Sequence, residues 1–219
     1  CLKYYPNIVD YFNLNSRETD IRRIKDLKAS LKRKKLLNSP KYENHLSILK
    51  MKIEYRLNNK KELDRIFSLT NKVNQFIFTY KRFSKSEIIE YINNPNKFVF
   101  TIALQDKFSN SGNVGVIFFS IIDNILYLDD LCVSCRALGR NLEDYFIFYP
   151  IKILLKKFKF DSLIIKFIPG PKNKPAKKYF FELQRKVSKI SKKNNFKIPL
   201  SKIKIIPIQN KDISISFKI

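Results

Sequence analysis

The order of strand-like and helical patterns in the sequence predicts an α+β domain preceded by a helical segment. Three observations support this fold class. Hydrophobic residues make up 44% of the 219 residues, which is enough to bury a core. Three strand-like segments follow one another directly in the middle of the chain, and helical patterns flank them. No internal repeat or low-complexity linker interrupts this order.

The first 49 residues have helical patterns. Asn15 and Glu18 form a capping box, and Ser39-Pro40 begins a short second helix that ends near Leu49. The first helix is expected to reach about Leu37, because an apolar residue recurs every three to four positions at Ile21, Ile24, Leu27 and Leu31. The chain begins with Cys1, so we expect it to be a piece of a longer protein.

The next segments predict a strand and two helices. Residues 51–57 alternate apolar and polar side chains, which predicts a strand, and a helix from Lys60 to about Thr70 follows. The amide-rich stretch 70–76 breaks the pattern. Ser84 and Glu87 then form a capping box for a helix that Asn94-Pro95 stops.

The middle of the chain predicts three antiparallel strands. They cover residues 97–104, 114–122 and 125–133, with a polar loop at 105–113. The last two strands are joined tightly at Asp123-Asn124, which is typical of a hairpin.

The remaining segments alternate between helix and strand. A long amphipathic helix is predicted from Leu142 to about Phe158, a buried strand at 161–168 and a helix at 174–186. The tail from Phe196 onward contains two further strand-like segments.

The formal charge of +25 raises the question of nucleic-acid binding. The lysines are spread over all predicted elements, and abundant Lys, Ile and Asn with scarce Gly fit an AT-rich coding bias. We therefore do not expect nucleic acid as a partner. No apolar run is long enough for a membrane helix, so we expect a cytoplasmic protein without a membrane partner. Cys132, Cys135 and His45 do not make a convincing zinc site, and no metal is expected.

The stretch "LCVSCRALGRNLEDYF", residues 131–146, predicts a phosphate site. A strand here ends in a short turn that opens a helix, whose free N–H groups attract anions. Gly139 allows a close approach of the backbone, and Arg136 and Arg140 could clamp phosphate oxygens. The alternative is a plain turn glycine beside two solvated arginines.

The same stretch resembles a known family of loops. Arg136-x-x-Gly139-x-Asn141, placed between a strand and a helix, resembles the Q/R-x-x-G-x-G/A acyl-CoA loop of GNAT-fold acyltransferases. Asn141 stands where that family prefers glycine or alanine. The resemblance implies a GNAT-like mixed sheet with helices on both faces. It also implies a cofactor-binding set of Val133, Ser134, Arg136, Gly139, Arg140, Asn141 and Asn173, with acyl-CoA or the phosphopantetheine thiol of a carrier protein as the cofactor.

Three longer segments, 69–76, 133–140 and 168–183, resemble the carboxyl-terminal half of FkbH-like proteins, which join a HAD-type phosphatase domain to a GNAT-like domain. The resemblance implies that residues 1–49 are a linker from a missing upstream phosphatase-type domain and that residues 50–219 form the acyltransferase domain. It further implies transfer of a glyceryl or related acyl group to a phosphopantetheine thiol, in polyketide or surface-polymer biosynthesis, with an acyl carrier protein as partner. The chain contains no D-x-D-x-[TV] phosphatase motif.

Three residues are candidates for catalysis. Asp129 is expected on one strand face with Leu131, Val133 and Cys135, where it could act as a base or simply pair with a lysine. Cys135 could be a thiolate nucleophile or a buried small side chain. Tyr179 matches the tyrosine acid of GNAT enzymes, although the FkbH-like pattern places that tyrosine one position later, at Phe180.

A cluster of amides and a hydroxyl is the candidate substrate site. It comprises Thr70, Asn71, Asn74 and Gln75, which lie at a predicted helix end within a segment that resembles the FkbH-like family. The alternative is a purely local role in capping and loop hydrogen bonding.

Overall fold

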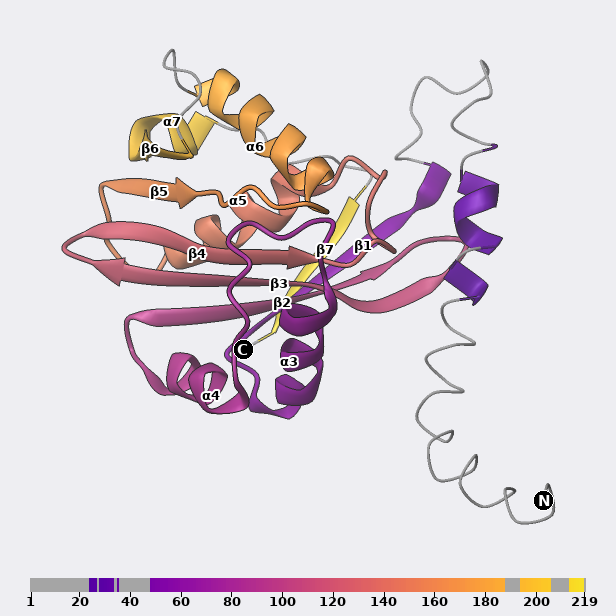
Figure 1. Cartoon of the computed structure of the whole chain (residues 1–219), viewed down its shortest axis with the longest axis horizontal. Coiled ribbons are helices and arrows are strands. Elements are labelled where there is room, and N and C mark those ends of the chain that lie inside the picture. The colour runs from indigo at the N-terminus through magenta and orange to yellow at the C-terminus, as the bar shows by residue number, and fades with distance from the viewer. Residues whose placement is uncertain are drawn as a thin grey trace.

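The described residues form a seven-stranded mixed sheet with helices packed on it (Figure 1). The computed structural model describes residues 24–26, 28–33, 35, 48–187, 194–205 and 213–218. The strand order across the sheet is β6-β5-β4-β3-β2-β1-β7. The strands are β1 (Met51–Leu57), β2 (Lys97–Gln105), β3 (Asn110–Ile122), β4 (Ile125–Val133), β5 (Ser162–Lys166), β6 (Asn195–Pro199) and β7 (Ile213–Lys218).

The three predicted central strands form an antiparallel meander. β2 pairs with β3 and β3 with β4, and the hairpin between β3 and β4 turns at Asp123 and Asn124. Both turn residues have positive φ, 49° and 60°, as a tight two-residue hairpin requires. β3 begins at Asn110, earlier than the sequence predicted, because the polar residues before Val114 still pair with β2 across register shifts.

Parallel pairings complete the sheet on both sides. β4 pairs with β5 in parallel, β5 with β6 antiparallel, and β1 with β7 in parallel. The neighbouring placement of β4 and β5, which the predicted fold required, is confirmed. The tail contributes the two expected strands, and a short helix that was not predicted, α7 (Leu200–Ile205), lies between them.

Helices cover both faces of the sheet, as predicted. A 3-10 turn, η1 (Lys60–Glu62), leads into α3 (Leu63–Lys72), and α3 and α4 (Lys85–Asn93) lie on one face (Figure 1). The capping box of Ser84 and Glu87 at the start of α4 is confirmed. α5 (Glu143–Leu154) lies on the opposite face, and α6 (Lys174–Val187) follows β5. A separate buried apolar cluster fills each side of the sheet.

The predicted amino-terminal helices lie mostly outside the described residues, as do Cys1 and His45. Residues 24–26, 28–33 and 35 are helical. Of the predicted apolar stripe, the two residues that the structure describes, Ile24 and Leu31, are 53% and 62% exposed. Asp26 and Arg33 are buried instead, because each forms an ion pair with the domain.

Candidate functional site

A pocket of about 710 Å³ lies where β4 ends. Its walls come from four parts of the chain: one face of α3 with residues 73–75, residues 111–113 of β3, residues 133–136 at the end of β4, and Lys172 in the loop before α6. The volume is typical of small-molecule sites.

The pocket is strongly basic. Arg65, Lys72, Arg136 and Lys172 line it, whereas no Asp or Glu does so among the described residues. The Nε atom of Arg65 donates to the carbonyl of Asn113, 3.0 Å away, which fixes this guanidinium against the wall. Such a concentration of positive charge in a concave site favours an anionic ligand.

The start of α5 is not the anion site that the sequence predicted. α5 begins at Glu143, whose carboxylate accepts backbone hydrogen bonds from Leu142 and Glu143 itself. Burial raises the pKa of Glu143, while these hydrogen bonds lower it. The carboxylate of Glu143 would therefore compete with a ligand phosphate at the start of the helix, and residues 137–145 do not line the pocket.

Gly139 allows a left-handed backbone conformation in the loop between β4 and α5. Its φ is +76°, and a Cβ added there would have no atom within 4 Å. The residue is therefore needed for a left-handed turn rather than for a close approach. Asn141, at φ 54°, adopts the same region, which explains why the loop accepts it in place of glycine or alanine. Neither residue lines the pocket.

The two predicted clamp arginines have different environments. Arg140 is only 4% exposed, and its Nη1 lies 3.0 Å from Asp106 Oδ2 in an ion pair. Burial, together with the nearby charge of Arg33, lowers the pKa of Arg140 to about 10. Its guanidinium is thus committed to Asp106, and the expected phosphate role is not supported. Arg136 does line the pocket, and its Nη1 lies 3.3 Å from Asp26 Oδ2.

Of the other predicted cofactor residues, two line the pocket and one does not. Val133 and Ser134 line the pocket. Asn173 is fully buried, and its amide donates to the carbonyls of Ile77 and Ile168, at 3.1 and 3.0 Å. Since Asn173 Oδ1 also accepts from the Gly170 N–H, this side chain holds loops together and does not face a ligand.

The predicted substrate cluster separates into two pairs. Asn74 and Gln75 line the pocket. Thr70 is buried and donates to the carbonyl of Phe67, and Asn71 donates to the carbonyls of Phe67 and Phe83. Thr70 and Asn71 therefore have the local capping role that was the alternative prediction.

A β-bulge corrects the predicted position of Asp129. The register shifts between Phe118 and Phe119, so that β4 carries one extra residue. As a result Asp129 does not share a face with Leu131: its Oδ1 accepts from Ser120 Oγ at 3.1 Å, on the side of α4. Burial raises the pKa of Asp129 to about 6, and hydrogen bonds from Ser120 and Tyr91 oppose the rise. The residue does not line the pocket.

The two cysteines of the CxxC do not converge. Cys135 is exposed and lines the pocket, whereas Cys132 is buried with its Sγ 3.6 Å from Asp130 Oδ2. Burial raises the pKa of the Cys132 thiol far above its usual value. Within the described ranges no group of three or more His, Cys, Asp or Glu could hold a metal ion.

Tyr179 lies in the core rather than at the pocket. Its hydroxyl donates to Asp144 Oδ1 at 2.7 Å, and its ring packs 5.8 Å from that of Phe76. Burial raises the pKa of Tyr179 far above its usual value, and the nearby Asp144 adds to the shift. The geometry gives no support to the predicted acid role, and Phe180, the alternative position, is buried.

Sequence reasoning missed the basic residues that α3 contributes. Arg65 and Lys72 are separated by seven residues, which is two helical turns and places them on one face. That spacing was available in the sequence. The spacing does not show what this face of α3 contacts, however. Only the fold shows that the face lies opposite the end of β4. Lys172 lies in the segment 168–183, which resembles the FkbH-like family, but the predicted site residues of that segment were Asn173 and Tyr179.

Coenzyme A and phosphopantetheine, the expected cofactors, fit the site in part. The four basic side chains suit the phosphate groups. The amide-bearing arm could lie along β4 only if backbone groups of this strand were unpaired. The Val133 N–H, however, already donates to the Phe76 carbonyl at 2.8 Å. The phosphate end therefore fits this pocket, whereas a path along β4 does not.

No family model matches the sequence, and no curated protein is significantly similar to it. Among the described residues, no helix is long and apolar enough to cross a membrane. Several solved structures are similar in fold.

A chimera of the spermidine N-acetyltransferase SpeG from Vibrio cholerae matches with a TM-score of 0.50 at 12% identity, over 70% of this chain and 98% of the other. The PaiA N-acetyltransferase from Thermoplasma acidophilum, in complex with coenzyme A, has a TM-score of 0.47 at 15% identity, over 66% and 96% of the two chains. NAA60 from Arabidopsis thaliana, in complex with acetyl-CoA, has a TM-score of 0.47 at 14% identity, over 60% and 83%. From the sheet topology and the match to the SpeG chimera, the chain has the GNAT fold of N-acetyltransferases.

Proposed function

We propose that this chain is an acyltransferase domain whose pocket at the end of β4 binds the phosphate of phosphopantetheine, either in coenzyme A or on a carrier protein. One observation carries the proposal: among the residues that the structure describes, four basic side chains and no acidic one line the pocket. The GNAT fold and the resemblance to the FkbH-like family support the reaction class. Fold alone does not fix an activity, so the pocket is the main support.

The finer proposal concerns the acyl group and the acceptor. We propose that the domain transfers a glyceryl or related acyl group to a carrier-protein thiol in polyketide or surface-polymer biosynthesis, together with an upstream HAD-type phosphatase domain. Exposed lysines of α6, namely Lys174, Lys177 and Lys178, follow Lys172 and would attract an acidic carrier protein. Of the three predicted catalytic residues, Cys135 alone lines the pocket and remains a candidate.

Binding of coenzyme A by calorimetry tests the proposal. Lys172→Glu should raise the Kd about tenfold, which is ~1.4 kcal/mol, because it places a negative charge against the phosphate. Lys157→Glu is the matched control: it changes the net charge equally at an exposed position outside the pocket, and its Kd should stay within about twofold of the parent. Pantetheine, which lacks phosphate, should bind at least about tenfold more weakly than coenzyme A. Equal effects of the two variants would refute the assignment of the pocket.

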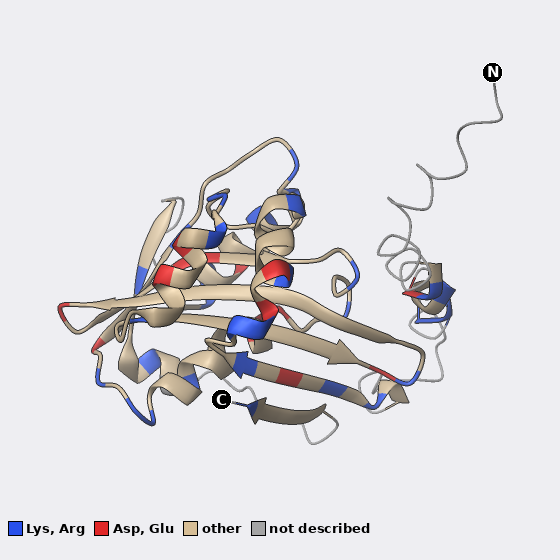
Figure 2. Ribbon diagram, turned by 90° about the horizontal axis from the view of Figure 1, so that it is seen from below, with Lys and Arg blue, Asp and Glu red and all other residues tan. Residues whose placement is uncertain are grey.

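The alternative function is a basic binding module for nucleic acid or an acidic protein, and the net charge of +25 favours it. Figure 2 shows the lysines and arginines distributed over helices, strands and loops rather than gathered in one stripe. Titration with duplex DNA across a salt series separates the two functions. Nanomolar affinity at physiological salt with clear sequence preference would favour the binding module over the acyltransferase.

A further inference from the structure

The gap between β4 and β5 contains a segment of the chain itself. β4 and β5 pair only between Ile125–Leu128 and Ser162–Ile165, after which β4 continues to Val133 without β5 as a neighbour. The loop between α3 and α4 crosses the strands and reaches this gap (Figure 1). Residues 76–79 of that loop, here called the inserted segment, lie along the second half of β4.

The inserted segment pairs like a short strand. On one side the Phe78 N–H donates to the Leu131 carbonyl at 3.1 Å, and the Val133 N–H donates to the Phe76 carbonyl at 2.8 Å. Ile77 and Cys132 form an antiparallel bridge between these bonds. On the other side the Ile168 N–H donates to the Phe78 carbonyl at 2.7 Å. The segment therefore binds β4 and the chain beyond β5 at the same time.

Two buried polar side chains fix the segment. Asp130 is 0% exposed, and its Oδ1 accepts from the N–H groups of Phe78, Thr79 and Leu131, at 3.2, 2.9 and 2.9 Å. Asn173, also 0% exposed, donates to the Ile77 carbonyl. Moving the segment would leave a buried carboxylate and a buried amide without these partners, which is energetically unfavourable.

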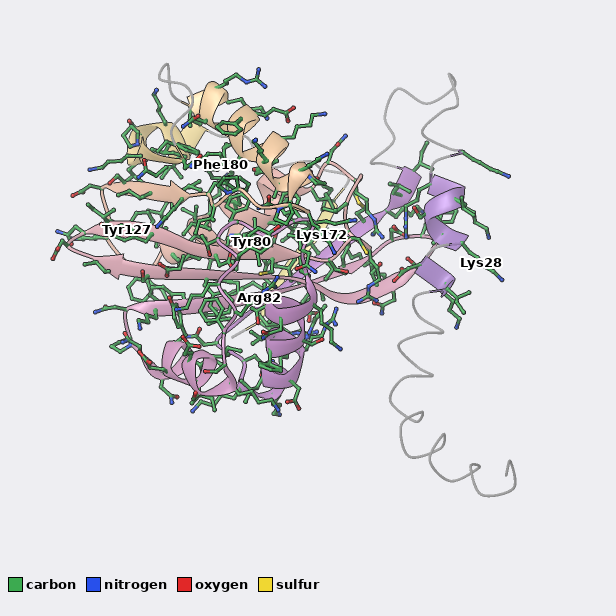
Figure 3. The ribbon with its side chains drawn as sticks, viewed as in Figure 1. Lys28, Tyr80, Arg82, Tyr127, Lys172 and Phe180 are labelled. Carbon is green, nitrogen blue, oxygen red and sulfur yellow. The ribbon has the colours of Figure 1, made fainter. Side chains whose placement is uncertain are left out.

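The residues that follow the inserted segment hold its far end. Tyr80 has a φ of 56°, and its ring lies against Gly170, where an added Cβ would be 2.3 Å from the ring (Figure 3). Arg82 donates to the Val73 carbonyl at 2.9 Å, so the loop is closed back onto the end of α3. The inserted segment is thus anchored at both ends as well as along its length.

The inserted segment is continuous with the wall of the pocket. Asn74 and Gln75 line the pocket and directly precede it, and Val133, which binds it, lines the pocket too. Three backbone groups of β4 that could pair with an extended, amide-bearing ligand are already used: the Leu131 N–H by Asp130, the Leu131 carbonyl by Phe78, and the Val133 N–H by Phe76.

We propose that the inserted segment is a built-in strand that excludes the ligand's arm from β4, so that a phosphopantetheine-bearing ligand binds wholly within the pocket on the α3 side. Asp130 is the positioning residue that holds this strand. The inference rests on the proposed function and adds to it the path that the ligand's phosphopantetheine arm takes. It predicts a site whose specificity is set by the side chains of α3 and of residues 73–75 rather than by backbone pairing with β4.

Amide hydrogen exchange of the full chain, with and without saturating acetyl-CoA, tests the inference. We expect exchange to slow in residues 72–75 and 133–136 and to stay unchanged at Phe78 and Thr79, whose N–H groups bind Asp130. Faster exchange or altered pairing at Phe78 and Thr79 on binding would overturn the inference, since the arm would then displace the segment. If acetyl-CoA neither binds by calorimetry nor protects any amide, the proposed function fails, and the inference fails with it.

Variants of Asp130 provide a second readout. Asp130→Asn keeps an acceptor oxygen, so exchange at Phe78 and Thr79 and the Kd for coenzyme A should stay within about twofold of the parent. Asp130→Leu removes that acceptor, so exchange at these two amides should speed up at least about tenfold, as expected for loss of a buried hydrogen bond. The Kd for coenzyme A should rise severalfold, because Asn74 and Gln75 lose their support. Tight binding with a mobile segment in Asp130→Leu would show that the segment is not part of the site.

Discussion

Asp129 and Asp130 are adjacent carboxylates with different tasks, and the β-bulge in β4 separates them. Asp130 is surrounded by three N–H donors, whereas the Oδ2 atom of Asp129 is buried without a hydrogen-bond partner within the described structure. Burial raises the pKa of both residues, to about 6 for Asp129. A carboxylate in that position destabilises the folded state when it is ionised.

The pH dependence of stability should therefore change in Asp129→Asn. In the parent, the folded-state pKa of Asp129 is about 6 and its ordinary value is 3.8. The folded state thus keeps a proton that the unfolded state releases, so Asp129 lowers the free energy of unfolding as pH rises from about 4 to above 6. Asp129→Asn should remove this contribution and stabilise the protein at pH 7.5 by up to ~3 kcal/mol.

Urea unfolding at pH 5 and pH 7.5 provides the measurement. The difference in stability between the two pH values should be larger in the parent than in Asp129→Asn. A variant that is less stable than the parent at pH 7.5 would mean that Asp129 has a cationic partner in solution.

Among the elements, the loop between β4 and α5 shows what local sequence can and cannot predict. A glycine between a strand and a helix correctly predicted a tight backbone feature there. The phosphate site predicted from the same glycine is not supported, because Gly139, Arg140 and Asn141 do not line the pocket. The same local signal would accompany either arrangement, and the direction in which each side chain points decides between them.

Substitutions of Gly139 should affect stability more than binding. Gly139→Val forces a β-branched residue to a φ of +76°, which should cost ~1–2 kcal/mol, whereas Gly139→Asn should cost less than half as much. Because Gly139 is outside the pocket, the Kd for coenzyme A of the folded fraction should remain within about twofold in both variants. Thermal unfolding and calorimetry measure the two effects separately. A large loss of affinity for coenzyme A in a fully folded variant would mean that the loop is part of the binding site.

At the scale of the whole molecule, a buried ionic cluster joins the amino-terminal segment to the domain. Arg33 Nε lies 2.7 Å from Asp106 Oδ2, and Arg140 pairs with the same carboxylate. Asp26 accepts from Ser111 and pairs with Arg136 at the pocket. The segment therefore contacts the domain through charges that are distant in sequence, whereas its apolar stripe predicted only that the segment is helical.

Removing the shared carboxylate should release the segment. Asp106→Ala leaves two buried guanidinium groups without their partner and should cost ~3–5 kcal/mol. Arg33→Ala leaves the pair of Asp106 and Arg140 intact and should cost clearly less. Limited proteolysis within residues 24–35 should follow the same order, and urea unfolding gives the energies. Equal stability of the two variants would show that the cluster is not cooperative.

How well a feature could be predicted depends on how far apart in the sequence the residues that form it lie. The α+β class, the hairpin at Asp123-Asn124 and the capping box at Ser84 depend on neighbouring residues, and each is confirmed. The pocket, the inserted segment and the bulge at Asp129 depend on which distant segments meet. Arg136 was predicted from the local pattern, whereas Val133, Ser134, Asn74 and Gln75 were predicted at a site through a family resemblance, which carries long-range information that the residue patterns lack; all five line the pocket.

The parallel pairing of β7 with β1 has a consequence for how the chain is made. Met51 pairs with Ile213, so the outer edge of β1 stays unpaired until β7, the last described strand, has left the ribosome. During that interval β1 offers an open edge to other nascent chains, and such edges lead to aggregation. The charges of Lys52, Glu54 and Arg56 alternate along β1 and would discourage unwanted partners until β7 arrives. Fragments that end before Ile213 should therefore be less soluble than the whole chain, even though every pocket residue is already present in them.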